Sequence, residues 1–132
     1  KVDILFLNDE EAVQLTNKTI NNAADEFLAN GPNIVIIKLG SKGSLLATKN
    51  KKVHISVVPD TKVIDPTGAG DSFAGGFLGY IAVHGINNIV HAIKHGTAIA
   101  SYTVSNFGVE NLSEIKNDDF KKKLSLITVK DC

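Results

Sequence analysis

Residues 33–39 read NIVIIKL, a β-branched run that is long enough for a buried strand and too short for a typical helix. The turn GSKG at residues 40–43 follows this run directly. Two further strand-like runs, at residues 44–48 and 53–58, flank the polar turn KNKK and predict an antiparallel hairpin. A sheet is therefore expected at the centre of the fold.

Helical patterns lie between and after these strands. The expected helices are a short one opened by Asn8 and its acidic neighbours, then residues 18–29, 70–84, 87–105 and 118–126. Residues 2–7 and 62–64 are predicted to be additional strands. Strands that alternate with helices imply an α/β layered fold around a mainly parallel sheet, and no repeat or linker divides the 132 residues.

Composition excludes several classes of partner. Fourteen basic residues balance fourteen acidic ones, so neither nucleic acid nor an anionic membrane is indicated. No apolar stretch approaches the roughly 20 residues of a membrane span and no secretory signal is seen, which favours a cytoplasmic protein. The only cysteine is Cys132, so a disulfide framework and a cysteine-based metal site are excluded. A small molecule or another protein is the expected partner.

Two histidines have the spacing of a zinc-binding helix without its other features. His91 and His95 are four residues apart, but Ala92 stands where the glutamate of the zinc motif would be, and no third ligand is evident. Both side chains are predicted to lie on a helix surface.

The glycine-rich string at residues 63–82 raises the question of an anion site. Gly68-Ala69-Gly70-Asp71 opens the predicted helix, and a helix N-terminus has unpaired amides and a partial positive charge. The Rossmann pattern would need glycine at Phe73, and the P-loop would need lysine and a hydroxyl residue at 76–77. Two interpretations remain. The segment is either another kind of phosphate cradle or a plain strand-to-helix turn with Asp71 as a first-turn acid.

Three glycines lie inside the same predicted helix. Gly75, Gly76 and Gly79 each cost about 1 kcal/mol relative to alanine in a helix interior. We therefore expect another part of the structure to press closely against that helix.

The string DPTGAGDSFAGGFL resembles the C-terminal signature of the ribokinase-like carbohydrate kinases, the PfkB family. That signature usually reads Asp-Thr-x-Gly-Ala-Gly-Asp followed by an aromatic residue and paired glycines, and Pro66 departs from it by replacing the usual threonine. Residues 8–16, NDEEAVQLT, are similar to the family's Asn-x-x-Glu segment, and residues 36–46, IIKLGSKGSLL, to its nucleotide-binding turn. The three motifs occur in the family's order.

This resemblance implies a three-layer ribokinase-like fold with a mainly parallel sheet. It also implies that residues 1–132 are the C-terminal nucleotide-binding and catalytic part of a kinase domain, whose N-terminal half and lid are absent. Because most substrate-recognising residues of the family lie in that half, the acceptor cannot be named. The isolated chain is expected to be inactive.

The activity implied is transfer of the γ-phosphoryl group of ATP to a sugar hydroxyl. In such a kinase the backbone amides of Gly68, Ala69 and Gly70 would bind the transferring phosphoryl group. Asp71 would accept the proton of the attacking hydroxyl.

The resemblance also implies residues for the nucleotide and for cations. The expected nucleotide-binding residues are Lys38, Gly40, Ser41, Gly43 and Thr97. The alternative interpretation of the glycine turn is an ordinary hairpin turn.

Asn8 and Glu11 would hold Mg²⁺ through its water shell, or would simply form a helix capping box. Asp65 and the carbonyl of Thr67 would bind a monovalent cation such as K⁺, or Asp65 would only stabilise a turn.

Other functions remain open at this point. The acceptor could be a nucleoside, as in an adenosine-like kinase, or the chain could be a nucleotide-binding module without catalysis. A third alternative is a structural subunit in which the cradle is only a turn. Because the strand at residues 2–7 would be left as an open sheet edge, we expect self-association or a complementary N-terminal half as partner.

Overall fold

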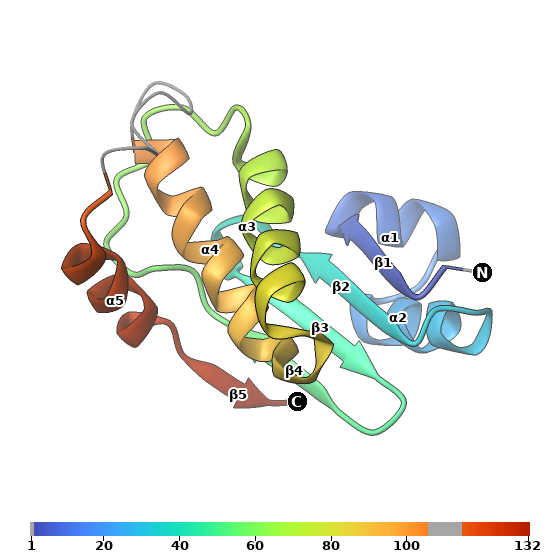
Figure 1. Cartoon of the computed structure of the whole chain (residues 1–132). Coiled ribbons are helices and arrows are strands. Elements are labelled where there is room, and N and C mark those ends of the chain that lie inside the picture. The colour runs from blue at the N-terminus through green and yellow to red at the C-terminus, as the bar shows by residue number, and fades with distance from the viewer. Residues whose placement is uncertain (1, 106–114) are drawn as a thin grey trace. The chain divides into compact units, whose positions relative to one another are not determined.

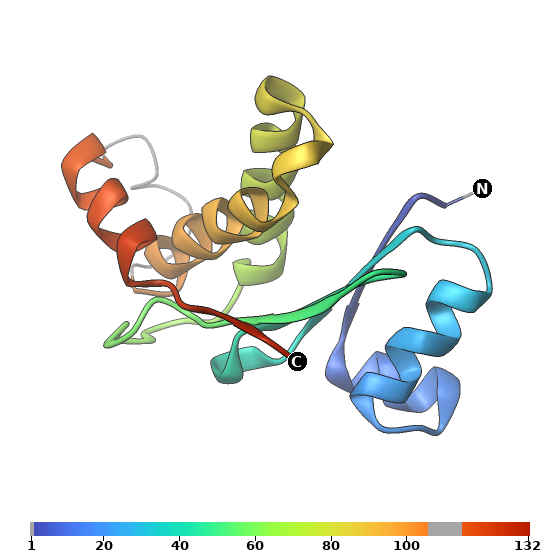
Figure 2. The same ribbon diagram turned by 90° about the horizontal axis from the view of Figure 1, so that it is seen from below.

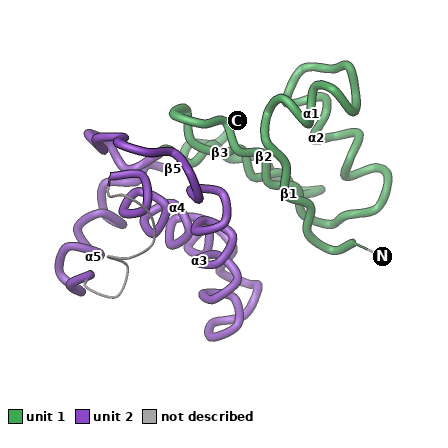
Figure 3. Tube along the Cα trace, turned by 90° about the horizontal axis from the view of Figure 1, so that it is seen from above, with its two compact units in different colours: residues 1–56, 129–132 green, residues 57–128 purple. Residues whose placement is uncertain are grey.

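The computed structural model describes residues 2–105 and 115–132 and divides the chain into two compact units (Figure 3). Unit 1 comprises residues 1–56 and 129–132, and unit 2 comprises residues 57–128. Unit 1 contains β1 (Ile4–Asn8), α1 (Asp9–Thr16), α2 (Ile20–Ala29), β2 (Ile34–Lys38), the 3₁₀ turn η1 (Gly40–Lys42), β3 (Ser44–Thr48), β4 (Lys52–Ile55) and β5 (Val129–Asp131). Unit 2 contains α3 (Ala69–His84), the 3₁₀ turn η2 (Ile86–Asn88), α4 (Ile89–Ser105) and α5 (Asn117–Leu126).

The sheet of unit 1 has the strand order β1-β2-β3-β4-β5 (Figure 1). Only β1 and β2 are parallel among the described strands, and the other three pairings are antiparallel. The expected predominance of parallel pairs is thus not seen in this part of the sheet. The reason is connection length: α1 and α2 provide the crossover that a parallel pair needs, whereas β2, β3 and β4 are joined by short turns.

The core of unit 1 lies between the sheet and the helices α1 and α2, which cover one of its faces (Figure 2). Its members are small or aliphatic side chains: Leu7, Ala12, Ala23, Ala24, Leu28, Val35, Ile37, Leu45 and Ala47. Because three of the four helical members are alanines, the helix backbones can approach the strands closely. This packing fixes α1 directly after the end of β1.

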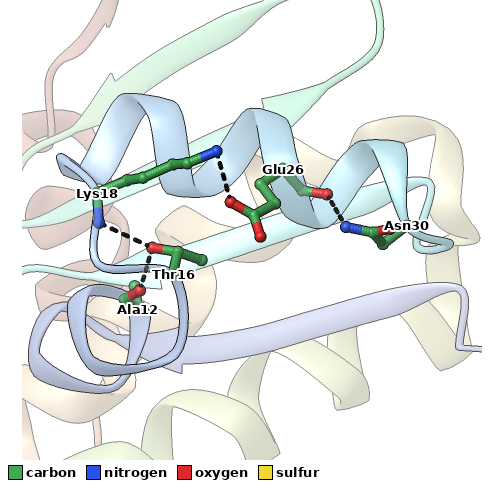
Figure 4. Close-up of polar contacts among 5 residues, drawn as sticks. All are labelled: Ala12, Thr16, Lys18, Glu26 and Asn30. Atoms are coloured by element: carbon green, nitrogen blue, oxygen red, sulfur yellow. Dashed lines mark hydrogen bonds and ion pairs between the residues drawn. The ribbon is translucent and has the colours of Figure 1, made fainter.

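Polar contacts hold the corner between α1 and α2 (Figure 4). The Thr16 hydroxyl donates to the Ala12 carbonyl over 2.7 Å and accepts from the Lys18 amide over 3.3 Å. The Lys18 ammonium forms an ion pair of 2.8 Å with Glu26, and the Asn30 side chain donates to the Glu26 carbonyl. The corner therefore ties the end of α1 to α2.

In unit 2, α3 and α4 cross at very short range. A Cβ on Gly76 would lie 3.0 Å from the Cα of Gly96, and a Cβ on Gly96 would lie 2.6 Å from the Phe73 carbonyl oxygen. The close packing expected from the helix glycines is therefore confirmed at Gly76. A Cβ on Gly75 or Gly79 would meet no atom within 4 Å among the described residues.

Aromatic side chains connect α3, α4 and α5. The His95 ring lies 5.4 Å from Tyr80 and 4.7 Å from Phe120, measured between ring centroids. His95 is half-buried, so its predicted surface position is wrong, whereas His91 is exposed as predicted. Burial, and secondarily the nearby His84, lower the pKa of His95.

Most predicted elements are present, with two differences. Residues 62–64 form no strand, because the amide of Ile64 donates to the carbonyl of Val104 in α4 over 2.7 Å. β5, which the sequence did not predict, pairs antiparallel with β4. Among the described residues, no helix has the length and apolar character needed to span a membrane.

Candidate active site

A tight turn leads into α3. Asp65 Oδ1 accepts a hydrogen bond of 2.9 Å from the Thr67 amide, and the Ala69 amide donates to the Pro66 carbonyl over 3.2 Å. Gly68 caps the helix with φ 78° and ψ 0°, in the left-handed region that favours glycine. The predicted strand-to-helix turn therefore has a backbone reason for glycine at position 68.

Two backbone amides at the start of α3 are available for an anion. In the part of the chain that the structure describes, the amides of Gly70 and Asp71 have no hydrogen-bond acceptor. Intrahelical bonding starts with Ser72, whose amide donates to the Gly68 carbonyl over 2.9 Å. Unpaired amides at the positive end of a helix favour a bound anion, and Gly70 has no side chain to cover them. These residues therefore fit a phosphoryl group.

Three residues that the motifs did not single out hold this turn. The buried Thr103 hydroxyl donates to the buried Ser72 hydroxyl over 2.8 Å. The Val104 carbonyl accepts from the amides of Ile64 and Asp65. Ser72 and Thr103 are small polar residues on otherwise apolar helix faces. That pattern is the only sequence signal that could have indicated their role in holding the turn.

The Asp65 carboxyl is held in its ionised form. Hydrogen bonds from Thr67, first from its side chain and then from its backbone amide, lower the pKa of Asp65 below the ordinary value. The turn-stabilising role is therefore present in the structure. A carboxylate that favours its ionised form is also suitable for a cation.

At the sheet of unit 1, two predicted residues end neighbouring strands. Asn8 is the last residue of β1 and Lys38 the last residue of β2, and the two are register partners in the parallel pair. Because parallel strands end at the same edge of a sheet, both lie at its carboxyl edge, where ligands of open α/β sheets bind.

Asn8 and Glu11 form the capping box that the sequence left as an alternative. Asn8 Oδ1 accepts from the Glu11 amide over 2.7 Å, and Glu11 Oε2 accepts from the Asn8 amide over 2.8 Å. Glu11 is exposed, and its other carboxylate oxygen has no partner among the described residues. That oxygen fits a cation that keeps most of its water shell.

The turn after β2 is a single 3₁₀ turn that its glycines make compact. Gly40 has φ 60° and open space around it, whereas Gly43 has φ 92°. A Cβ on Gly43 would lie 2.1 Å from the Ile55 carbonyl oxygen. A ring nitrogen of His54 also hydrogen-bonds the Lys42 carbonyl. Packing against β4 therefore explains Gly43 but does not explain Gly40, and Ser41 is exposed.

Thr97 lies on α4, almost two helical turns before Thr103. Its half-buried hydroxyl donates to the Ile93 carbonyl of the same helix over 2.8 Å. In unit 2 the predicted residues 65–71 are therefore gathered in one turn, and Thr97 is separate from it.

The surface hollows of the described residues do not coincide with the predicted site residues, and no metal cluster is found among them. One hollow of about 430 Å³ in unit 1 is lined by Asp9, Glu10, Val13, Gln14 and Ile20. A second hollow, in unit 2, lies between the 58–61 loop, α4 and α5. Neither hollow is lined by a predicted site residue. No group of three or more His, Cys, Asp or Glu side chains suitable for a metal occurs in residues 2–105 and 115–132. The candidate residues therefore form two separate groups, one at a helix N-terminus in unit 2 and one at a strand edge in unit 1.

Comparison with known proteins identifies the family. Residues 1–116 match the model of the pfkB family carbohydrate kinases. The chain belongs to this family. The family recognised from the three motifs is therefore confirmed.

The chain is similar to a nucleoside kinase, a ribokinase and an aminoimidazole riboside kinase. The nucleoside kinase of Methanocaldococcus jannaschii is 43% identical over 76 residues, which are 58% of this chain and 24% of the relative. The ribokinase structure from Thermotoga maritima is 34% identical with a TM-score of 0.79, over 93% of this chain and 42% of that one. The aminoimidazole riboside kinase of Salmonella enterica, solved with aminoimidazole riboside and an ATP analog, is 28% identical with a TM-score of 0.78, again over 93% and 42%.

The structural matches confirm the ribokinase-like α/β fold. This pfkB family chain spans about two-fifths of the length of those solved relatives. The roles of its individual residues remain predictions.

Proposed function

We propose that the chain is the phosphoryl-transferring part of a pfkB family kinase that phosphorylates a sugar hydroxyl. The observation that carries the proposal is the start of α3, where the unpaired amides of Gly70 and Asp71 follow the left-handed Gly68. Family membership supports the reaction class, and the unpaired amides at this helix N-terminus support these residues as its location.

The donor proposed is ATP, which supplies the phosphoryl group when bound. The amides of Gly70 and Asp71 neutralise charge that builds up on the transferring group, and they need no reorganisation because the helix already holds them. The Ala69 amide, also predicted as a donor, is instead bonded to the Pro66 carbonyl. The Thr103–Ser72 hydrogen bond keeps this first turn in place. A cytoplasmic location, where ATP is available, is part of the proposal.

Asp71 is proposed as the acceptor of the hydroxyl proton. Its side chain is exposed in the first turn of α3, the same turn that carries the unpaired amides, and this supports the proposed role. A loose transition state requires only a weak base, since the proton leaves late in the transfer.

Mg²⁺ and the nucleotide are assigned to the strand edge of unit 1. Glu11 and Asn8 are proposed to orient the water shell of Mg²⁺, and the Lys38 ammonium to balance phosphate charge. Gly40, Ser41 and Gly43 are proposed to approach the nucleotide, and Thr97 the adenine. Asp65 with the Thr67 carbonyl is the proposed site of a monovalent cation such as K⁺, supported by the lowered pKa of Asp65.

A nucleoside acceptor is the second candidate. The Methanocaldococcus nucleoside kinase shares 43% identity over 76 residues with this chain. The residues that determine specificity for a ribose or a nucleoside are expected in the part of a pfkB family kinase that the chain does not span.

A chimera tests the proposal. This chain replaces the matching two-fifths of Thermotoga maritima ribokinase, and ADP formation is measured with a panel of sugars and nucleosides. Asp71→Asn is expected to lower turnover by about 10² or more, the usual scale for a positioned base, and to change ATP affinity by a few-fold at most.

Asp60→Asn is the matched control, because Asp60 is also exposed and its left-handed φ of 56° suits asparagine. Near-normal turnover of Asp71→Asn would remove Asp71 from the reaction. A folded chimera that binds ATP but transfers no phosphate would favour the binding-module alternative.

A further inference from the structure

A buried hydroxyl at the strand edge of unit 1 has no hydrogen-bond partner. Ser44, the first residue of β3, is 4% exposed, and its Oγ has no partner within residues 2–105 and 115–132. Buried polar groups of folded proteins are almost always hydrogen-bonded, because a buried group without a partner lowers stability. The Ser44 hydroxyl is therefore expected to acquire a partner when the site is in use.

Ser44 lies in the same row of the sheet as Lys38. The two residues are register partners in the antiparallel pair of β2 and β3, so their side chains point to the same face. Their chain neighbours Ile37 and Leu45 belong to the core that packs against α1 and α2, so Lys38 and Ser44 point to the opposite face. The two side chains therefore start side by side at the carboxyl edge of β2.

The Lys38 ammonium also lacks a polar partner in the part of the chain that the structure describes. The ion pairs there involve Lys18 and Lys52, and the lysine ammonium groups that donate hydrogen bonds belong to Lys52 and Lys123. An ammonium on a flexible four-carbon stem samples many positions unless an acceptor holds it. A hydroxyl oxygen is such an acceptor.

We propose that Ser44 is a positioning residue for Lys38. Its hydroxyl oxygen accepts a hydrogen bond from the Lys38 ammonium and holds the two remaining donors toward the nucleotide phosphates. The Cβ atoms of directly opposite residues in an antiparallel pair are about 5 Å apart, so a change of lysine rotamer brings the two groups together. The inference rests on the nucleotide-binding role proposed for Lys38 and adds the residue that orients its ammonium.

Two measurements on Ser44→Ala test this role. In the chain without nucleotide, the substitution removes a hydroxyl that has no partner, so the urea midpoint should be equal to or higher than that of the parent. In the Thermotoga chimera, the affinity for ADP, measured by isothermal titration calorimetry, should fall about tenfold, the scale of one hydrogen bond to a charged group.

A double-mutant cycle shows whether Ser44 acts through Lys38. Lys38→Met keeps an unbranched stem and removes the charge, so it should lower the affinity of the chimera for ADP about tenfold or more. In the Lys38→Met background, Ser44→Ala should cause no further loss of affinity. An equal loss in both backgrounds would overturn the positioning role, because the hydroxyl would then act on ADP independently of Lys38.

Ser101→Ala is the matched control, because Ser101 is also buried but its hydroxyl donates to the Ala98 carbonyl over 2.7 Å. This variant should lower the urea midpoint and leave the affinity for ADP unchanged. The same result for Ser44→Ala would overturn the inference and leave the proposed function standing. Unchanged affinity of Lys38→Met for ADP would refute the role of Lys38 and this inference with it, and a parent chimera that binds no ADP would contradict the proposed function itself.

Discussion

The Thr103 hydroxyl and the Ser72 hydroxyl form a buried hydrogen bond of 2.8 Å directly behind the first turn of α3. Thr103→Val removes the donor while keeping the side-chain shape, and it leaves the Ser72 hydroxyl buried without this partner. We expect the free energy of unfolding to fall by about 1 to 3 kcal/mol, as for other buried polar groups that lose a partner. Urea unfolding, monitored by circular dichroism, measures this change in the free energy of unfolding.

Thr103→Ser is the control for this change. Serine keeps the hydroxyl and loses only the methyl group, so its loss of stability should be smaller than that of valine. A larger loss for serine than for valine would show that packing, and not the hydrogen bond, holds the turn.

The two glycines of the 3₁₀ turn after β2 should respond very differently to substitution. Gly43→Ala combines a left-handed φ with a Cβ 2.1 Å from the Ile55 carbonyl oxygen, so we expect a loss of about 3 kcal/mol or more. Gly40→Ala meets only the φ penalty, about 1 kcal/mol. Equal urea midpoints for the two variants would contradict the contact with β4.

Local patterns predicted most of the fold. Residues 33–39 and the hairpin were recognisable because short β-branched runs and polar turns act locally. β5 was not, because Val129–Asp131 is a short exposed strand without an apolar pattern. The strand expected at residues 62–64 is absent because Val104, far along the chain, takes the Ile64 amide.

The candidate site was predictable to the extent that it consists of motifs. Gly68–Asp71 and the Asn8–Glu11 pair are continuous segments, so sequence alone indicated them. The Ser72–Thr103 link was not predictable, since it depends on how α3 and α4 pack. Likewise, sequence predicted a close neighbour for the α3 glycines without showing which face of the helix it contacts.

Substitutions of Glu11 should separate its role in the capping box from its proposed role in binding Mg²⁺. Glu11→Gln keeps an acceptor for the Asn8 amide, so the capping box persists and the stability should change by less than about 0.5 kcal/mol. The carboxylate charge is lost, so the Mg²⁺ concentration needed for half-maximal turnover of the Thermotoga chimera should rise. Titration of turnover against Mg²⁺ measures it.

Glu11→Ala is the comparison, because it also breaks the capping box and should cost about 1 kcal/mol of stability. An unchanged Mg²⁺ requirement in both variants would restrict Glu11 to its capping role.

His95 predicts a pH dependence of stability. Burial and the neighbouring His84 lower the pKa of His95 in the folded state below the ordinary histidine value of about 6.5, while Tyr80 and Phe120 face the ring. The unfolded state therefore binds a proton more readily, so stability is complete above about pH 6.5 and decreases as the pH falls toward the folded-state pKa. Urea midpoints at several pH values measure the slope.

His95→Phe keeps an aromatic ring without a titrating group, and it should flatten that slope. His91→Gln, which changes an exposed histidine on the same helix, should leave the slope unchanged. A slope that responds to His91 and not to His95 would contradict the assignment.

The pairing of β5 with β4 has a consequence for the entropy of the chain. Residues 129–132 return to the sheet of unit 1 after all of unit 2, and the Cys132 amide donates to the Lys52 carbonyl over 3.0 Å. Unit 2 is therefore a closed loop with two attachments to unit 1 and not a domain on a single linker. Closing a chain segment at both ends reduces the number of conformations that it can adopt, and the entropic cost of closure grows only slowly with the length of the loop. A strand of three residues thereby lowers the conformational entropy of the whole segment at residues 57–128.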